Sequence, residues 1–161
     1  MEIRNAEEAD FDRILALNLA EVRQTSPMDR ERLRLLHGLA CYHKVAIVDR
    51  QVGAFLIAMR EGAAYENENY AWFAARFEKF IYIDRIIVAS ELAGGGIGAI
   101  MYRHLFDFAR SLGVDHITCE YNIEPPNPAS RIFHDRFGFT ELDTRLVGDG
   151  SKRVSMQVAE T

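Results

Sequence analysis

Apolar positions recur along this chain with two different periods, and these periods predict where helices and strands lie. Apolar residues three or four apart mark a helix after Asn5 and another after Asp29. Continuous apolar runs mark strands that are buried on at least one face. The predicted order is a strand, two helices, a hairpin, a strand, a helix, a strand, a helix and a closing hairpin. The predicted strands are residues 2–4, 44–48, 52–59, 80–88, 115–121, 139–147 and 153–158.

Polar residues refine the boundaries of the first two helices. Asn5, followed three residues later by Glu8, resembles a capping box, and Asp29 is placed to cap the second helix. The arginines near the second helix are expected mostly on its solvent face; they are Arg23, Arg30, Arg32 and Arg34. Residues 60–76 have no regular period, so we expect a long connection whose aromatic residues either pack it down or line a concave site.

Length and composition indicate one domain that spans residues 1–161, because 161 residues with 48% apolar content suffice for one core and are too few for two ordinary domains. The net charge of −5, without a dense basic cluster, argues against nucleic-acid binding. No run approaches the ~20 apolar residues of a membrane span, and the acidic N-terminus does not resemble a signal peptide, so a cytoplasmic protein is expected. The oligomeric state stays open, a homodimer included.

Cysteine spacing adds little chemistry. Cys41 and Cys119 are too few for a disulfide framework and lack the spacing of metal ligands. We therefore expect two reduced core cysteines and no metal site.

The sequence AGGGIG, residues 93–98, connects the strand 80–88 to a helix that ends near Leu112. A glycine-rich loop at a helix N-terminus is a natural anion site, because the first backbone N–H groups lack partners and the helix dipole favours negative charge. Gly94, Gly96 and Ala99 satisfy the dinucleotide fingerprint, which would indicate an oxidoreductase. Five residues separate this fingerprint from the strand, however, and the chain ends in an antiparallel hairpin, so this alternative is disfavoured.

A second motif, [QR]-x-x-G-x-[GA], fits the same loop. In residues 127–139, NPASRIFHDRFGF, Asn127-Pro128 predicts the start of a helix and Gly138 predicts its end. With the strand 80–88 and the loop, this segment resembles the GNAT N-acetyltransferase superfamily, and in particular a branch of uncharacterised acetyltransferases. The resemblance implies an α/β (α+β) fold: a mixed, mostly antiparallel central sheet flanked by helices.

The resemblance also implies acetyl-CoA as the co-substrate. The residues expected to hold it are Ile86, Ile87, Val88, Ala93, Gly94, Gly95, Gly96, Ile97, Gly98, Asn127, Ser130 and Phe133. Ala93 departs from the family's Arg or Gln, and His134 stands where the family usually has a Tyr that assists the departing thiolate. Because of these two departures, an alternative function stays open: a module that binds coenzyme A without catalysing a reaction.

The transfer of an acetyl group to an amine needs a base. Strand alternation predicts Tyr82, Asp84, Ile86 and Val88 on one face, which would bring Asp84 close to the reacting carbon. A carboxylate in so apolar a strand is costly unless it is paired or used, so Asp84 is either a base or one half of an ion pair with an arginine. Glu120, near the end of the next strand, is the second candidate base, and His134 is the candidate acid.

The acceptor is expected between the first two helices and the connection 60–76. It would be a primary amine of a small molecule, an amino acid or a peptide. The residues expected to line its site are Asn18, Tyr65, Asn69, Tyr70 and Trp72.

Overall fold

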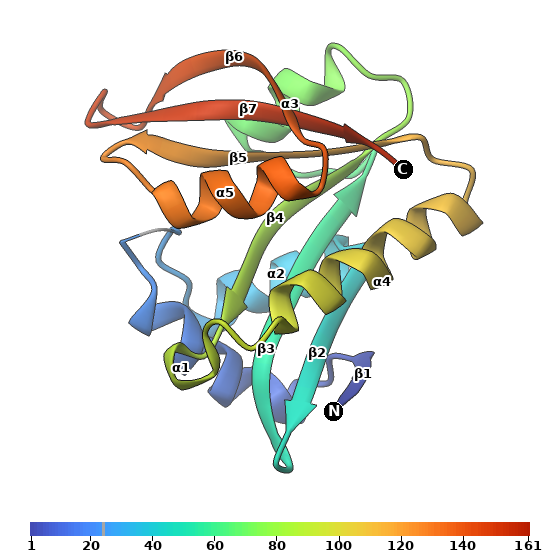
Figure 1. Ribbon diagram of the computed structural model, residues 1–161, viewed down its shortest axis with the longest axis vertical. Coiled ribbons are helices and arrows are strands. Elements are labelled where there is room, and N and C mark those ends of the chain that lie inside the picture. The colour runs from blue at the N-terminus through green and yellow to red at the C-terminus, as the bar shows by residue number, and fades with distance from the viewer. Residues whose placement is uncertain (24) are drawn as a thin grey trace.

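The computed structural model describes residues 1–23 and 25–161, which fold around one seven-stranded sheet (Figure 1). The strand order is β1-β2-β3-β4-β5-β7-β6, and every neighbouring pair among them is antiparallel except β4–β5. The mixed, mostly antiparallel sheet expected from the sequence is therefore confirmed. The strands are β1 (Glu2–Asn5), β2 (Tyr42–Val48), β3 (Gln51–Arg60), β4 (Ile81–Val88), β5 (His116–Glu124), β6 (Thr140–Val147) and β7 (Lys152–Glu160).

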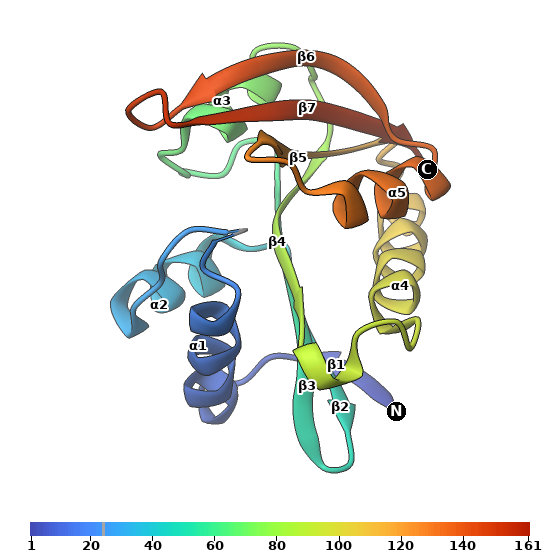
Figure 2. The same cartoon turned by 60° about the vertical axis from the view of Figure 1, so that its left-hand side comes forward.

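Helices cover both faces of the sheet (Figure 2). The apolar side chains of α1, α2 and α3 pack into one core on the first face, and those of α4 pack into a second core on the other face, together with Phe133 of α5. The helices are α1 (Phe11–Ala20), α2 (Arg30–Leu39), α3 (Glu68–Ala74), α4 (Ile97–Ser111) and α5 (Pro128–Arg136). No helix in these ranges is long and apolar enough to cross a membrane.

The first helix starts later than its sequence pattern predicts. Asn5 is paired with Lys44 as the last residue of β1, so it cannot cap a helix. The backbone N–H of Glu7 instead donates to the Asp10 carboxylate, at 2.8 Å, at the start of a short 3₁₀ turn that leads into α1. The predicted capping box at Asn5 is therefore wrong, because strand pairing takes precedence over the local capping signal. The cap of α2 is confirmed, since Asp29 accepts from the backbone N–H of Arg32 at 2.8 Å.

The connection before β4 contains a helix that the sequence pattern did not reveal. Asn67 caps α3 by accepting from the backbone N–H of Tyr70 at 3.0 Å. Tyr70 and Phe73, three residues apart, are buried on one side of this short helix. Only two apolar positions carry the period, which is too few to predict a seven-residue helix from sequence.

Strand β4 contains a bulge at Asp84. Ile57 pairs with Arg85 and Ala58 pairs with Ile83, so Asp84 is an extra residue that faces no partner on β3. A bulge of this kind breaks the alternation of side chains between the two faces of a sheet.

The bulge overturns the predicted shared face of Tyr82, Asp84, Ile86 and Val88. Tyr82 packs in the core under α1, α2 and α3, whereas Ile86 and Val88 pack against the core under α4. The prediction was wrong because strict alternation assumes an unbroken register, and the bulge shifts the side chains after Asp84 by one face.

Strands β4 and β5 separate soon after they meet. Their parallel pairing comprises only Ile81 with Ile117 and Tyr82 with Thr118, although both strands continue well beyond these residues. Figure 2 shows β4 descending toward α1 while β5 stays with β6 and β7. The edge of β4 that faces away from β3 thus has no strand partner beyond Tyr82 in the described pairing, which leaves backbone groups available for a ligand.

Candidate active site

The N-terminus of α4 is open and contains little besides backbone. Gly94 and Gly96 have positive φ angles, of 81° and 82°, and Gly96 is the N-cap of α4 without a side chain to satisfy it. A Cβ atom added at either glycine would meet no heavy atom within 4 Å. This arrangement exposes unpaired N–H groups at the positive end of a 15-residue helix, which suits a phosphate or pyrophosphate.

The two sequence motifs meet in space. A Cβ atom at Gly98, in the first turn of α4, would lie 3.5 Å from the Phe133 ring of α5 and 3.8 Å from Val88 of β4. Asn127 caps α5 by accepting from the backbone N–H of Ser130 at 3.3 Å. The residues expected to hold a coenzyme therefore come from one end of β4, the loop 93–98 and the N-terminal half of α5.

His134 is buried, and both of its ring nitrogens have partners. Nδ1 lies 2.7 Å from the carbonyl oxygen of Ser130, and Nε2 lies 2.8 Å from the hydroxyl of Tyr102. The ring also stacks on Tyr121, with centroids 5.3 Å apart. Burial lowers the pKa of His134, so the imidazole is neutral near pH 7. Its proposed part as an acid thus involves a ring already bonded to Tyr102, a residue that the sequence did not single out.

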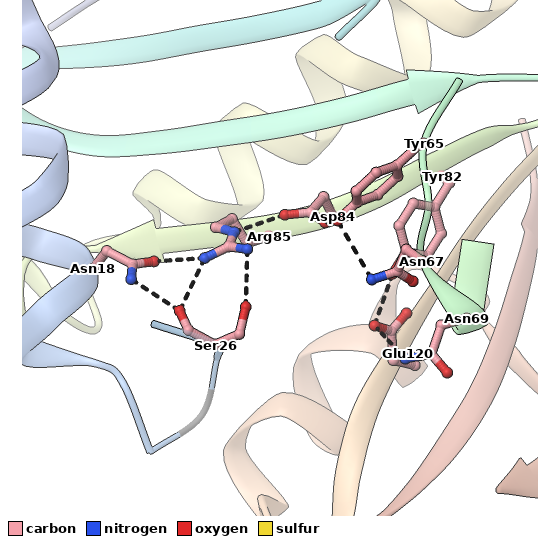
Figure 3. Close-up of polar contacts among 9 residues, drawn as sticks. All are labelled: Asn18, Ser26, Tyr65, Asn67, Asn69, Tyr82, Asp84, Arg85 and Glu120. Atoms are coloured by element: carbon pink, nitrogen blue, oxygen red, sulfur yellow. Dashed lines mark hydrogen bonds and ion pairs between the residues drawn. The ribbon is translucent and has the colours of Figure 1, made fainter. Parts of the chain in front are cut away.

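Glu120 has one carboxylate oxygen that is held and one that is free (Figure 3). Oε1 accepts from the Tyr82 hydroxyl at 2.8 Å and from Asn69 Nδ2 at 3.1 Å. Oε2 is buried without a hydrogen-bond partner among the described residues, and so is Asn69 Oδ1. Burial raises the pKa of Glu120 to about 7; the negative charge of Asp84 adds to the rise, while the hydrogen bonds from Tyr82 and Asn69 oppose it.

Asp84 and Arg85 form an ion pair in which both side chains are about 4% exposed. Arg85 Nε lies 2.6 Å from Asp84 Oδ2, and the Tyr65 hydroxyl donates to Asp84 Oδ1. Of the two roles that the sequence left open for Asp84, the structure shows the ion pair. A carboxylate that is already neutralised by a guanidinium is a poorer proton acceptor than an unpaired one.

Asn18 belongs to the network of Arg85. Its Oδ1 accepts from Arg85 Nη1 at 2.9 Å, and its Nδ2 donates to the carbonyl oxygen of Ser26 at 3.0 Å (Figure 3). Arg85 also donates to the Ser26 carbonyl and hydroxyl, at 3.1 and 3.0 Å. Asn18 and Arg85 therefore hold the segment that precedes α2 against β4.

The remaining predicted acceptor residues divide into two groups. Tyr65 and Asn69 lie with Asp84 and Glu120, as Figure 3 shows. The Tyr70 hydroxyl instead bonds the backbone of Arg60 and Ala63, at 2.6 and 3.0 Å. Trp72 packs edge-on against Phe73 and under the guanidinium of Arg76, 3.6 Å from its ring centre. The polar contacts of Tyr70 and the ring contacts of Trp72 thus lie outside the cluster around Glu120.

Several residues of the site were missed by sequence reasoning. Tyr82 and Asn67 contribute polar atoms beside the acids, and Tyr102 bonds to His134. The alternation of β4 could have placed Tyr82, but nothing local links Tyr102 to His134, which is 32 residues away. Among the described residues, no group of three or more His, Cys, Asp or Glu side chains is arranged to hold a metal ion.

Solved structures with a similar fold include one protein named Ard1 and two that are named as ribosomal-protein alanine N-acetyltransferases. Ard1 from Thermoplasma volcanium aligns with a TM-score of 0.81 and 13% identity over 99% of this chain and 97% of that chain. The ribosomal-protein-alanine N-acetyltransferase of Brucella melitensis aligns with a TM-score of 0.76 and 24% identity over 100% of both chains. The ribosomal-protein-S18-alanine N-acetyltransferase of Escherichia coli aligns with a TM-score of 0.74 and 16% identity, over 99% of this chain and 92% of that chain.

No curated protein sequence matches this chain. Residues 4–139, however, match the family model described as the acetyltransferase (GNAT) family. This range contains β4, the glycine loop, α4 and α5, the elements that form the open helix N-terminus and the buried acid cluster. The chain therefore belongs to the GNAT family of N-acetyltransferases, which are acyltransferases.

Proposed function

We propose that this protein transfers the acetyl group of acetyl-CoA to a primary amine, and that Glu120 is the base. The observation that carries the proposal is the state of Glu120: its Oε2 is buried without a hydrogen-bond partner among the described residues, and burial raises its pKa to about 7. A base with a pKa near the working pH combines a useful deprotonated fraction with proton affinity. An ammonium group brings the donors that Glu120 Oε2 and Asn69 Oδ1 lack.

The donor site fits coenzyme A. Acetyltransferases of this family use acetyl-CoA, which supplies an activated acetyl group. Backbone N–H groups at the start of α4, with Gly94 to Gly98, would bind the pyrophosphate, and Ala93 leaves that task to the backbone. The unpaired edge of β4 at Ile86, Ile87 and Val88 would bind the extended arm, with Asn127, Ser130 and Phe133 of the α5 region opposite.

The residues around Glu120 have separate tasks in this proposal. Tyr82 and Asn69 fix the carboxylate through Oε1, so that Oε2 is directed to the incoming amine. Glu120 removes a proton from the ammonium form, directly or through water, and the neutral amine can then attack the acetyl carbonyl. Asp84 is neutralised by Arg85 and held by Tyr65, so the charge that would attract a cationic acceptor is that of the Glu120 carboxylate. In this proposal Tyr102 turns its hydroxyl proton from His134 Nε2 to the departing thiolate, and His134 assists by holding Tyr102 in place.

The acceptor class stays as broad as a primary amine of a small molecule, an amino acid or a peptide. The names of two structural neighbours, which describe acetylation of alanine on ribosomal proteins, support the inclusion of peptide α-amines among the acceptors to be tested.

The test is thiol release from acetyl-CoA over a panel of small amines, amino acids and peptides. We expect turnover with at least one acceptor, and a loss of roughly 10²–10⁴-fold in kcat/KM for Glu120→Gln, the usual contribution of a general base. Glu124→Gln, an exposed acid on the same strand, is the matched control and should retain full activity. An unchanged kcat/KM in Glu120→Gln would refute Glu120 as the base.

A second candidate function is coenzyme binding without turnover, favoured by the departures at Ala93 and His134 from the common family pattern. A thermal shift with acetyl-CoA and CoA, combined with no thiol release for any acceptor, would support it. Stabilisation by NAD or NADP alone would contradict both candidates.

A further inference from the structure

Three arginines of α2 differ in what they contact. Arg30 pairs with Asp12, and Arg34 pairs with Glu8 at 2.7 Å. Arg32, between them, forms no ion pair with any of the described residues, and its guanidinium lies 5.5 Å from the ring centre of Tyr65. Arg32 is partly buried, whereas the sequence pattern placed it mostly with its neighbours on a solvent face. The structure thus provides a cation that has an aromatic support but no ion pair among the described residues.

Arg32 lies on the wall of a cleft with a volume of about 460 Å³. The cleft runs between the end of α1 and the start of α2, and its other walls are mostly apolar. Its lining residues are Asn18, Leu19, Val22, Pro27, Met28, Asp29 and Arg32. A cleft of this size can hold a few residues of an extended peptide.

The Arg32 end of the cleft offers hydrogen-bond donors to an anion, beside the Asp29 carboxylate. Asp29 is the one carboxylate among the lining residues, and its Oδ1 is already used to accept the backbone N–H of Arg32. The unpaired N–H groups of the first turn of α2 add a partial positive charge at the same place. An anionic group in the cleft would therefore meet the guanidinium of Arg32 without competition from an existing ion pair.

Two buried side chains, Tyr65 and Tyr82, lie between Arg32 and Glu120. Tyr65, which carries Arg32 over its ring, donates its hydroxyl to Asp84. Tyr82, whose ring centre is 6.4 Å from that of Tyr65, donates its hydroxyl to Glu120. The free oxygen of Glu120 and the free guanidinium of Arg32 are thus separated by two aromatic rings.

A molecule that contacts both Glu120 and Arg32 must have its amine and its acidic group far apart. A free α-amino acid bears both groups on one carbon and cannot bridge two aromatic rings. An extended peptide advances about 3.3–3.6 Å per residue, so a few residues suffice. We infer that the acceptor is a peptide whose N-terminal amine reaches Glu120 and whose acidic side chain, beyond the first residue, is bound by Arg32. This inference rests on the proposed function for the amine end.

The probes that test this inference are pentapeptide amides of alanine with one Glu at position 2, 3 or 4, each with a Gln analogue of the same length. Binding to the full protein in the presence of CoA is measured by calorimetry, and transfer is measured separately by thiol release. We expect the best Glu peptide to bind roughly tenfold more tightly than its Gln analogue, as for one charge-assisted hydrogen-bonded pair. This preference should weaken as salt is raised.

The decisive variant is Arg32→Gln, with Arg34→Gln as the matched control on the same helix. Arg32→Gln should abolish the preference for Glu while leaving the affinity for the Gln peptide and for acetyl-CoA unchanged; Arg34→Gln should keep the preference. Equal binding of all Glu and Gln pairs, no peptide binding at all, or a preference that survives Arg32→Gln would overturn the inference. Arg32-dependent binding without transfer would support the acid site at Arg32 and contradict transfer to peptide amines, whereas transfer without any Glu preference would support the proposed function and overturn the inference.

Discussion

The hydroxyl of Tyr102 donates to Nε2 of His134 across 2.8 Å, because Nδ1 of the same ring is engaged with the carbonyl oxygen of Ser130 at 2.7 Å. The hydrogen bonds thereby fix one neutral tautomer of a buried imidazole, consistent with its lowered pKa. A tyrosine of α4 and a histidine of α5 thus join the two helices that carry the sequence motifs.

Removal of this hydroxyl should destabilise the protein. Tyr102→Phe leaves Nε2 of His134 buried without a donor, which costs about 1–3 kcal/mol. Tyr121→Phe is the control, since it keeps the ring that stacks on His134 and loses the partly buried contacts of its hydroxyl with Gln157, at 3.3 Å, and Ser155. Urea denaturation at pH 7.5 measures both variants; equal losses would show that the bond between Tyr102 and His134 adds nothing to stability.

The raised pKa of Glu120 predicts a pH dependence of stability with a definite sign. The pKa is about 7 in the folded protein and 4.5 in the reference state, so the folded protein keeps a proton that the unfolded chain has lost between these values. Stability contributed by this group is therefore full below about pH 4.5 and is lost as the pH rises to about 7, by up to roughly 3 kcal/mol.

Glu120→Gln should remove that loss. The variant is expected to gain stability relative to the wild type as the pH rises from 4.5 to 8, while its transferase activity falls. Glu124→Gln, on an exposed side chain, should parallel the wild type throughout. Guanidinium denaturation at several pH values measures the difference, and a difference that does not change with pH would contradict the raised pKa.

The glycine loop can be tested with two matched substitutions on one helix. Gly96 and Gly113, at opposite ends of α4, both have positive φ angles, of 82° and 70°, and an added Cβ at either meets no heavy atom within 4 Å. Alanine at either position should cost about 1–2 kcal/mol through backbone strain alone. Only Gly96→Ala should also weaken CoA binding, because its methyl group occupies the space proposed for the phosphates. Calorimetric titration with CoA checks this, and equal affinities in the two variants would refute the loop assignment.

The buried ion pair between Asp84 and Arg85 should be costly to break from one side. Arg85→Met leaves the Asp84 carboxylate buried without its cation and releases the contacts to Asn18 and Ser26, so a loss of about 3–5 kcal/mol is expected. Adding Asp84→Asn to this variant should recover part of the loss, because the uncompensated charge is then gone. Thermal unfolding of the two single variants and the double variant completes the cycle; strictly additive losses would contradict the coupling.

The sequence was sufficient where the decisive signals are local. Signals that depend on neighbours within a few residues were predicted: the strand runs, the caps at Asp29 and Asn127, and the glycines of the loop 93–98. The resemblance of the two motifs to a known family then predicted the fold. The hairpin of β2 and β3 was also predicted from the sequence, although its turn residues Asp49 and Arg50 adopt positive φ angles without a glycine.

The features that the sequence did not reveal depend on pairing between distant segments. The bulge at Asp84 exists only in the register of β4 against β3, and the choice between an ion pair and a base for Asp84 followed from that register. Glu120 was only the second candidate base, because its free oxygen becomes visible only when Tyr82 and Asn69 are in place around it. Arg32 resembled its neighbours Arg30 and Arg34 until their partners were known.

The early separation of β4 and β5 has a consequence for how the protein opens. Because these strands share only two residue pairs, the segments 2–88 and 116–160 each satisfy most of their ladder hydrogen bonds internally. Amide hydrogen exchange should then reveal two cooperative units with different protection, joined through α4, rather than one uniform sheet. A ligand that binds across the gap would contact both units, and it should therefore make their exchange rates converge.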